Sequence, residues 1–420
     1  MAAVNAIICM IDRYNSGNLL LDLLFILLLS EAVKTILFVI GNLGLGGAER
    51  QMFTLIRELK IIGYHCHVFV LQAEGPIREL LIEEGVPIHD GAYHSVFSRG
   101  SALRALVRAQ WNLVQTIRAL RPDIVHAFLP LTNFMAALAG QLLGVRLIIT
   151  SRRALNTHQD RQPLWKPFDR LAYHLSHRVT VNSKAVWQDT VARDRVKGTK
   201  LALIYNGINA QRFERIERTR TQLRADLHLT EADIAIVKIG NLIPYKGHAD
   251  LLQAMVFVVE RHPQARLFCV GEDRGELPSL QRLAGDLGIA SHVQFLGGKE
   301  DIAPWLSAMD MAVIASHEEG FSNAVLEAMV AGLSVVATRV GGNPEALENG
   351  RLGILANPRD PVDLAKAISE VIDNFPKWRS IAKKARHHVY EKYSVAAMAN
   401  AYVKLYENGE GSYTLNDVPR

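Results

Sequence analysis

Cysteine is scarce in this chain, and its few cysteines form no pattern. Only three occur among the 420 residues, at Cys9, Cys66 and Cys269, and they lie far apart. An odd number of scattered cysteines provides no disulfide framework of the kind that small secreted proteins use. The composition therefore fits the reducing cytosol.

Signals for metal or nucleic-acid binding are also weak. His65 and His67 flank Cys66 on an apolar strand, where alternation places both imidazoles on one face. Such a pair could contribute to a metal site, but solvated histidines at a strand end explain the pattern as well, and we prefer that interpretation. The chain has no zinc finger, basic zipper or aromatic RNP-type motif, so we expect no nucleic-acid partner.

Residues 19–29 form an apolar run, LLLDLLFILLL, that one acid interrupts. It is shorter than the roughly 20 residues that a membrane-spanning helix needs. A signal peptide is an alternative, although Arg13 is the only base before the run and residues 30–32 make a poor cleavage site. We predict that residues 1–33 are an apolar extension, either a membrane-surface helix or a segment upstream of the fold.

The rest of the chain has the composition of a globular protein with uneven charge. Hydrophobic residues make up 49% and charged residues 21% of the chain. A chain of 420 residues is too long for a single domain with one ordinary core, which suggests two domains. The net charge of +5 hides a basic region, because residues 91–200 contain 17 lysines and arginines but 5 acidic residues. Such a region suits an anionic membrane or a phosphate-bearing substrate.

Two series of apolar segments, separated by helical patterns, predict an α/β fold with two parallel sheets. The unbroken run at residues 35–40 is typical of a strand covered on both faces. The first series continues to residue 181, and a second runs from residue 234 to residue 355. We predict domains at 34–207 and 231–385, a charged connection at 208–230, and a C-terminal helix and tail at 386–420.

The most informative segment is EEGFSNAVLEAM at residues 318–329, which follows an apolar strand predicted at 311–315. Open α/β sheets bind ligands at the carboxyl ends of strands, and a helix amino terminus there offers N–H groups to a phosphate. Glu319 and Glu327 would repel phosphate but can accept hydrogen bonds from hydroxyl groups. A phosphate site beside a polyol site indicates a nucleotide-sugar.

A glycine loop follows the first predicted strand. Gly44, Gly46 and Gly47 leave room for a ligand to approach the backbone. Glu49 stands where a dinucleotide fingerprint has its third glycine, and the second strand ends at Gln72 without the usual acid. A dehydrogenase is therefore disfavoured. A tight turn that needs positive φ is the less favoured alternative for these glycines.

Five motifs occur in an order that resembles glycosyltransferase family 4. They are GGAER at 46–50, NGI at 206–208, KGH at 246–248, the two glutamates separated by seven residues, and GGNPE at 341–345. The resemblance covers residues 35 to 405 approximately. It implies the glycosyltransferase-B fold, in which two Rossmann-like domains face a cleft and the last helix commonly returns to the first domain. It also implies a retaining enzyme that requires no metal or other cofactor.

The resemblance also assigns roles to residues of the cleft. Glu319 would bind hydroxyls of the donor sugar, Glu327 would bind the ribose, and Lys246 would neutralise the departing diphosphate, a task that suits a mobile point charge. Outside this motif Lys246 would be a solvated loop lysine. The other donor contacts implied are Gly46, Gly47, Asn241 and the backbone of Phe321, Ser322, Asn323 and Ala324.

The chain departs from the family pattern at two places. Asn241 stands where an arginine usually accompanies the lysine, so one cation is missing unless Arg50, Arg152 or Arg153 replaces it. Ser151 and the two arginines after it replace a common strand-end histidine. We expect Arg152 and Arg153 to face an acidic or phosphorylated acceptor.

His126 ends another predicted strand. The resemblance implies that it lines the donor-sugar pocket as a catalytic residue, although a capping or core histidine fits the same position.

The basic region also contains an amphipathic pattern. Arginines and apolar residues interleave there: Arg104, Arg108, Arg118 and Arg121 with Leu103, Leu106, Val107 and Leu113. Such a surface could touch lipid, and a solvated helix face is the alternative.

Together these features predict a retaining glycosyltransferase that moves a hexosyl unit from a UDP- or GDP-sugar to a lipid-linked saccharide or polysaccharide precursor. We expect a cytoplasmic protein bound peripherally at the anionic inner face of the cell membrane. A UDP-sugar epimerase is one alternative, and it would consume donor without an acceptor. A non-catalytic nucleotide-sugar-binding protein is another, and it would bind donor without releasing nucleotide.

Overall fold

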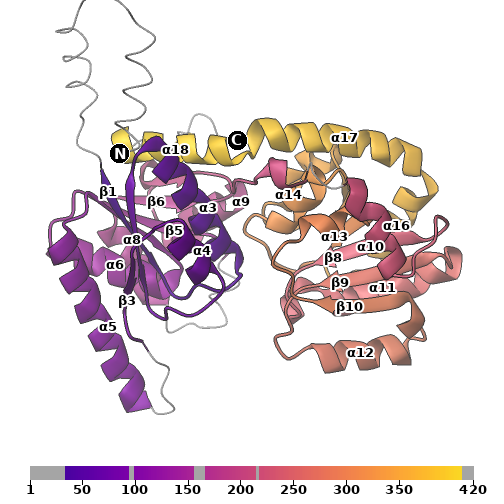
Figure 1. The fold of residues 1–420 in the computed structure, drawn as a ribbon, viewed down its shortest axis with the longest axis horizontal. Helices are drawn as coiled ribbons and strands as arrows, with labels where there is room; N and C mark the ends of the chain where they lie inside the picture. The colour runs from indigo at the N-terminus through magenta and orange to yellow at the C-terminus, as the bar shows by residue number, and fades with distance from the viewer. Residues whose placement is uncertain (1–33, 94–98, 156–165, 214–216, 409–420) are drawn as a thin grey trace, which may run out of the picture.

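The computed structural model describes residues 34–93, 99–155, 166–213 and 217–408. The predicted extension at 1–33 lies outside these ranges. Two α/β domains lie side by side (Figure 1). Each is built on a parallel sheet, with seven strands in the first domain and six in the second. The two predicted sheets are therefore confirmed.

The first sheet has the strand order β3-β2-β1-β4-β5-β6-β7. Its strands are β1 (Thr35–Ile40), β2 (His65–Val70), β3 (Ile88–Asp90), β4 (Ile124–Phe128), β5 (Leu147–Arg152), β6 (Arg178–Val181) and β7 (Leu201–Leu203). The helices of this domain are α3 (Gly47–Ile62), α4 (Ile77–Glu83), α5 (Arg99–Leu120), α6 (Pro130–Leu142), α8 (Lys166–Leu175), α9 (Lys184–Asp194) and the short η2 (Gly198–Lys200).

Burial on both faces explains the unbroken apolar sequence of β1. Ile36 and Phe38 belong to a core cluster that includes α3, whereas Leu37 and Val39 belong to a cluster with α5 and α6. Because neighbouring side chains of a strand point to opposite faces, each layer of helices needs its own set of apolar residues.

The second sheet has the order β10-β9-β8-β11-β12-β13. Its strands are β8 (Ile234–Ile239), β9 (Ala265–Val270), β10 (Val293–Gly297), β11 (Met311–Ile314), β12 (Ser334–Thr338) and β13 (Ile354–Ala356). Its helices are η4 (Pro244–Lys246), α11 (His248–Arg261), α12 (Leu277–Asp286), η5 (Ala290–His292), α13 (Ala303–Ser307), α14 (Asn323–Val330), α15 (Asn343–Ala346), η6 (Glu348–Gly350), α16 (Pro361–Asp373) and α17 (Phe375–Lys392).

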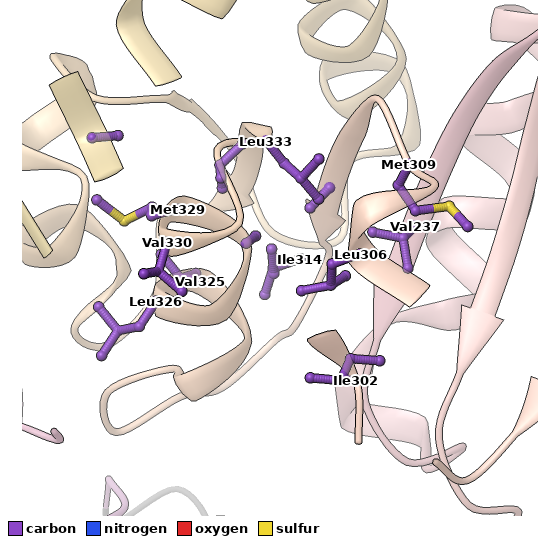
Figure 2. Close-up of a cluster of buried hydrophobic side chains, with 14 of the residues drawn as sticks. Val237, Ile302, Leu306, Met309, Ile314, Val325, Leu326, Met329, Val330 and Leu333 are labelled. Carbon is purple, nitrogen blue, oxygen red and sulfur yellow. The ribbon is translucent and has the colours of Figure 1, made fainter. Parts of the chain in front are cut away.

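Helix α14 is anchored by a large apolar cluster. Figure 2 shows side chains of α14 gathered with side chains of β8, β11, α13 and the residue that precedes α13: Val325, Leu326, Met329 and Val330 with Val237, Ile314, Leu306 and Ile302. Fixing this helix also fixes its amino terminus, which residues 315–322 connect to the carboxyl end of β11.

Where the structure describes it, at 208–213 and 217–230, the charged segment predicted as a connection packs against the second domain. It contains η3 (Ala210–Phe213) and α10 (Glu217–Asp226). Arg220 and Arg224 of α10 both bind Asp310, and they also donate to backbone carbonyl groups of residues 307–309. These two arginines thus hold α10 against the second domain.

The end of the chain crosses from the second domain back to the first. Helix α17 lies along the second domain, and α18 (Val395–Asn408) continues along the first (Figure 1). Met398, Tyr402 and Tyr406 of α18 belong to the core cluster of β1 and α3. The predicted boundary at residue 385 falls inside α17, so the second domain ends later than the sequence indicated.

Candidate active site

A cleft of about 470 Å³ lies between the two domains. It is bounded by the glycine loop and the start of α3, by the carboxyl ends of β5 and β8, and by the segment from β11 into α14. Every residue predicted for the site except His126 lines it: Gly46, Gly47, Arg152, Arg153, Asn241, Lys246, Glu319, Phe321, Ser322, Asn323, Ala324 and Glu327.

Lys246 and Glu319 form an ion pair inside this cleft. The Lys246 Nζ donates to Glu319 Oε1 at 2.7 Å, and the same oxygen accepts from Ser316 Oγ at 2.8 Å. Burial lowers the pKa of Lys246, but attraction to Glu319 and the hydrogen bond outweigh it, so the pKa lies above its usual value. The lysine therefore stays charged, and its charge is balanced by one carboxylate.

Two glycines allow these residues to meet. Gly247 follows Lys246 with φ +69°, and a methyl group there would lie 1.9 Å from the carbonyl oxygen of Ala315. Gly320 follows Glu319, and a methyl group there would lie 2.0 Å from the carbonyl oxygen of Arg153 in the other domain. Any larger residue at these two positions would push the β8 loop or the first domain away from the cleft.

Glu327 approaches the cleft from the second turn of α14. Burial raises its pKa, while the positive charges of Arg50 and Arg212 lower it and the negative charge of Asp301 raises it further. A carboxylate that is partly desolvated and only weakly compensated gains stability from new hydrogen-bond donors. A ribose could supply such donors.

The amino termini of α3 and α14 face each other across the cleft. A methyl group on Gly47 would lie 3.4 Å from Asn323 Nδ2. Gln51 Nε2 and Asn206 Nδ2 both donate to Asn323 Oδ1, at 3.3 and 2.6 Å. The first N–H groups of a helix have no acceptor inside the helix, and a helix start favours negative charge, so this part of the cleft suits an anion.

His126 does not reach the cleft, and here the structure corrects the prediction. Its ring is completely buried, with Nδ1 2.8 Å from the hydroxyl oxygen of Tyr406 and Nε2 2.8 Å from Ser151 Oγ. Burial and the charge of Arg153 lower its pKa to about 3, so the ring is neutral. The return of α18 supplies Tyr406 and covers the histidine, which makes it a core residue.

Arg152 and Arg153 have different surroundings, although both line the cleft. Arg152 is 3% exposed and its guanidinium binds Asp189 at 2.8 Å and also Asp194, so its charge is already matched by α9. Arg153 donates to Asn206 Oδ1 and lies 5.9 Å from the ring centre of Phe128. Of the two, only Arg153 has a guanidinium without a carboxylate in direct contact among the described residues, so it suits an anionic acceptor better.

Asn241 and Arg50, the remaining candidate for the missing cation, are also engaged. Asn241 Oδ1 accepts from the backbone N–H of Glu272 at 3.2 Å, which turns the amide toward β9. Arg50 reaches the second domain, where its guanidinium donates to the carbonyl groups of Lys299 and Glu300 at 3.4 and 3.5 Å.

Two further cleft residues were not predicted. Glu49 lies in the first turn of α3, and burial raises its pKa against the opposing effects of a backbone hydrogen bond and Arg153. Asn206 joins the domains through Phe321 and Asn323. Both occur in the quoted motifs, GGAER and NGI, but only the tertiary contacts show that their side chains face the cleft.

Within the described ranges, no cluster of three histidine, cysteine, aspartate or glutamate side chains could hold a metal ion. No helix in the same ranges is long and apolar enough to span a membrane.

Comparisons with known proteins agree with this geometry. Residues 45–212 match the family described as Glycosyltransferase Family 4, and residues 233–374 match the family described as Glycosyl transferases group 1. These two regions correspond to the two domains that form the cleft.

Individual relatives give the same result. The chain is 28% identical over 288 residues to N-acetyl-alpha-D-glucosaminyl L-malate synthase of Bacillus anthracis, covering 68% of this chain and 74% of that protein. It is 25% identical over 367 residues to D-inositol 3-phosphate glycosyltransferase of Streptomyces avermitilis, covering 82% and 79%.

Among solved structures, Anabaena Alr3699/HepE in complex with UDP-glucose superposes with a TM-score of 0.79 at 23% identity, covering 89% of this chain and 99% of that one. A likeness at this identity concerns the fold. The chain therefore belongs to glycosyltransferase family 4 and is a glycosyltransferase with the glycosyltransferase-B fold.

Proposed function

We propose that this enzyme transfers a hexosyl unit, with retention of anomeric configuration, from a UDP- or GDP-sugar to a lipid-linked saccharide or polysaccharide precursor. The observation that carries this proposal is the meeting of Glu319, Glu327 and Lys246 in one cleft beside the start of α14. The Lys246 amine and the start of α14 would bind the diphosphate of the donor. Glu319 would bind its sugar ring, and Glu327 would bind its ribose.

The arrangement suits departure of a nucleotide diphosphate. As the glycosidic bond breaks, negative charge develops on the leaving oxygen of the diphosphate. Lys246 and the N–H groups at the start of α14 would stabilise that charge, which is commonly the largest catalytic contribution in such a site. Glu319 already accepts hydrogen bonds from Lys246 and Ser316. This fits a carboxylate that binds sugar hydroxyls, with attack on the face from which the diphosphate leaves and no protein nucleophile.

The related proteins support a donor and an acceptor class. The neighbouring structure of HepE contains UDP-glucose, which favours uridine over guanosine for this chain. Two relatives are named for malate and for inositol 3-phosphate, both of which carry negative charge. A phosphorylated acceptor, such as a lipid-linked saccharide diphosphate, would meet Arg153 at the first-domain wall of the cleft.

An exposed surface of α5 supports binding of the protein to an anionic membrane. Leu103, Val107 and Trp111 lie one helical turn apart and are 63%, 63% and 60% exposed. Arg104 and Arg108 are exposed beside them. Apolar side chains flanked by arginines are typical of helices that bind anionic lipid at the interface. We call Leu103, Arg104, Val107, Arg108 and Trp111 the α5 stripe.

The test is a transfer assay with the full chain. UDP-glucose, UDP-N-acetylglucosamine and GDP-mannose are each offered with a polyprenyl-diphosphate-linked saccharide in anionic vesicles. We expect nucleotide release that requires both donor and acceptor, and an axial linkage from an axial donor in the NMR spectrum of the product. The variant Lys246→Met serves as the inactive control.

Other outcomes identify the alternatives. Conversion of a UDP-sugar to another UDP-sugar without acceptor would identify an epimerase. Donor binding without nucleotide release across the acceptor panel would identify a binding protein. Family membership favours the transferase over both.

A further inference from the structure

Lys238 is a completely buried lysine in the centre of the second sheet. It lies on β8 with 0% of its surface exposed, and its ammonium nitrogen has no hydrogen-bond partner among the described residues. Desolvating a charged amine without a partner is strongly unfavourable. An apolar side chain would fill this position without that cost, so the amine needs a physical explanation.

The position of Lys238 places it beneath the cleft. Val237 packs on the α14 face of the sheet and Ile236 on the α11 face, so alternation puts Lys238 on the α11 face. A methyl group on Gly240 would lie 3.9 Å from Lys238 Nζ and 3.6 Å from Lys246 Cδ. Both lysine side chains therefore flank Gly240, which lines the cleft.

The charged and titratable groups around Lys238 come from four elements. They are Lys246 of η4, Glu319 after β11, Cys269 of β9 and His248 of α11. Burial raises the pKa of Cys269 to about 12 and lowers the pKa of His248 to about 2, so both are neutral near pH 7. The one carboxylate of the group, Glu319, is bound to Lys246.

Among the described residues, the group around Lys238 thus contains two amines, those of Lys238 and Lys246, and a single carboxylate, that of Glu319. Burial and repulsion by Lys246 lower the pKa of Lys238 to about 7, against smaller opposing effects of Glu319 and Cys269. A nucleotide diphosphate would bring the negative charge that this group lacks, and it would raise the pKa of both lysines.

We propose that Lys238 is the second cation of the diphosphate site and takes the place of the arginine that Asn241 replaces. Above pH 7 it is mostly uncharged before the donor binds, and it takes up a proton from solvent when the diphosphate binds. Its charge then compensates Glu319 as Lys246 turns toward the phosphates. Lys238 remains buried, so it is a positioning residue and not a catalytic one. This inference rests on the proposed function, because it requires a diphosphate-bearing donor.

Proton uptake makes affinity depend on pH in a defined direction. Below pH 7 Lys238 is already protonated, so binding needs no further proton. Above pH 7 each bound diphosphate must draw one proton from solution, and affinity for UDP weakens by about tenfold per pH unit until the pKa of the complex is reached.

The experiment is calorimetric titration of UDP into the full chain at pH 8, in buffers of different ionisation enthalpy. We expect an uptake close to one proton per UDP bound. The variant Lys238→Met keeps the unbranched shape and removes the amine. It should abolish the uptake, flatten the dependence of the UDP Kd on pH between 7 and 9, and lower kcat. Cys269→Ser, in the same cluster, is the matched control and should retain the uptake.

Each result decides the matter. Uptake that persists in Lys238→Met, or that is lost in His248→Asn but not in Lys238→Met, would overturn the inference. If Lys238→Met does not fold, the wild-type protein still provides a test, since binding of UDP without proton uptake at pH 8 excludes the mechanism. Failure of both UDP and GDP to bind the wild-type protein would instead refute the proposed function.

Discussion

Lys246 donates a 2.7 Å hydrogen bond to Glu319 across 73 residues of sequence, so the two residues assigned to diphosphate and sugar neutralise each other in this structure. A donor that binds both must separate them. The ion pair is 22% and 11% exposed at its lysine and glutamate side chains, so solvent screens it only partly. We therefore expect Lys246 and Glu319 to stay paired until the diphosphate of the donor binds Lys246 and the sugar hydroxyls bind Glu319.

The variant Glu319→Gln should separate binding from turnover. It removes the charge that holds Lys246 while keeping the size of the side chain, so we expect UDP to bind at least as tightly as to the parent. Loss of the carboxylate that orients the sugar should lower kcat by about 10²- to 10³-fold, as for other preorganised polar groups. Calorimetry with UDP and steady-state transfer rates measure the two effects. Glu79→Gln, on the exposed surface of α4, should change neither, and weaker UDP binding by Glu319→Gln would contradict the assigned role.

The variant Glu327→Gln should chiefly weaken nucleotide binding. Hydrogen bonds to a charged group contribute about 1.5–3 kcal/mol, so loss of the carboxylate should raise the UDP Kd by roughly 10- to 100-fold. Turnover at saturating donor should change much less, because the ribose is distant from the bond that breaks. The Kd of UDP and the kcat under saturation test this. An unchanged Kd would show that Glu327 has only a structural role.

The free energy of unfolding should decrease as the pH is lowered, because His126 is buried and neutral in the folded protein. Its pKa is lowered to about 3 in the folded protein, whereas an exposed histidine titrates near 6.5. The unfolded chain therefore binds a proton that the folded chain does not, and stability declines by up to about 1.4 kcal/mol per pH unit as pH falls from 6.5 toward 3. His248, with a pKa of about 2, adds a second contribution of the same sign.

Urea denaturation at several pH values between 7 and 4 measures this slope. The variant His126→Gln should reduce it by about one proton, even if the variant is less stable at every pH. An identical slope in His126→Gln would mean that the histidine is not neutral in the fold.

The α5 stripe should determine binding to anionic membranes. Arg104→Gln with Arg108→Gln removes two cations, each worth about 1 kcal/mol near such a surface, so vesicle affinity should fall by roughly 30-fold. Trp111→Ser should lower affinity even at high salt, because it removes apolar contact and not charge. Sedimentation with anionic and zwitterionic vesicles measures both. Val362→Ser, which changes an exposed residue of α16 in the second domain, is the control and should bind like the parent.

Local patterns in the sequence were sufficient to predict where the strands lie and which candidate site residues follow their carboxyl ends. The apolar run at β1 indicated a strand buried on both faces, and Glu319 followed β11 at the edge where parallel sheets bind ligands. Such patterns report the immediate surroundings of a residue, because a strand or helix repeats its environment every few residues.

Only the tertiary structure decided which of these residues face the cleft. His126 has the sequence position of a site residue, but Tyr406, 280 residues later, covers it. Arg152 has the charge for an acceptor, but α9 supplies two carboxylates that neutralise it. Lys238 sits in an apolar strand pattern, and nothing local shows that its amine lies beneath Gly240 beside Lys246. The reason is physical: charge and burial depend on neighbours brought together by packing, and those neighbours are remote in the sequence.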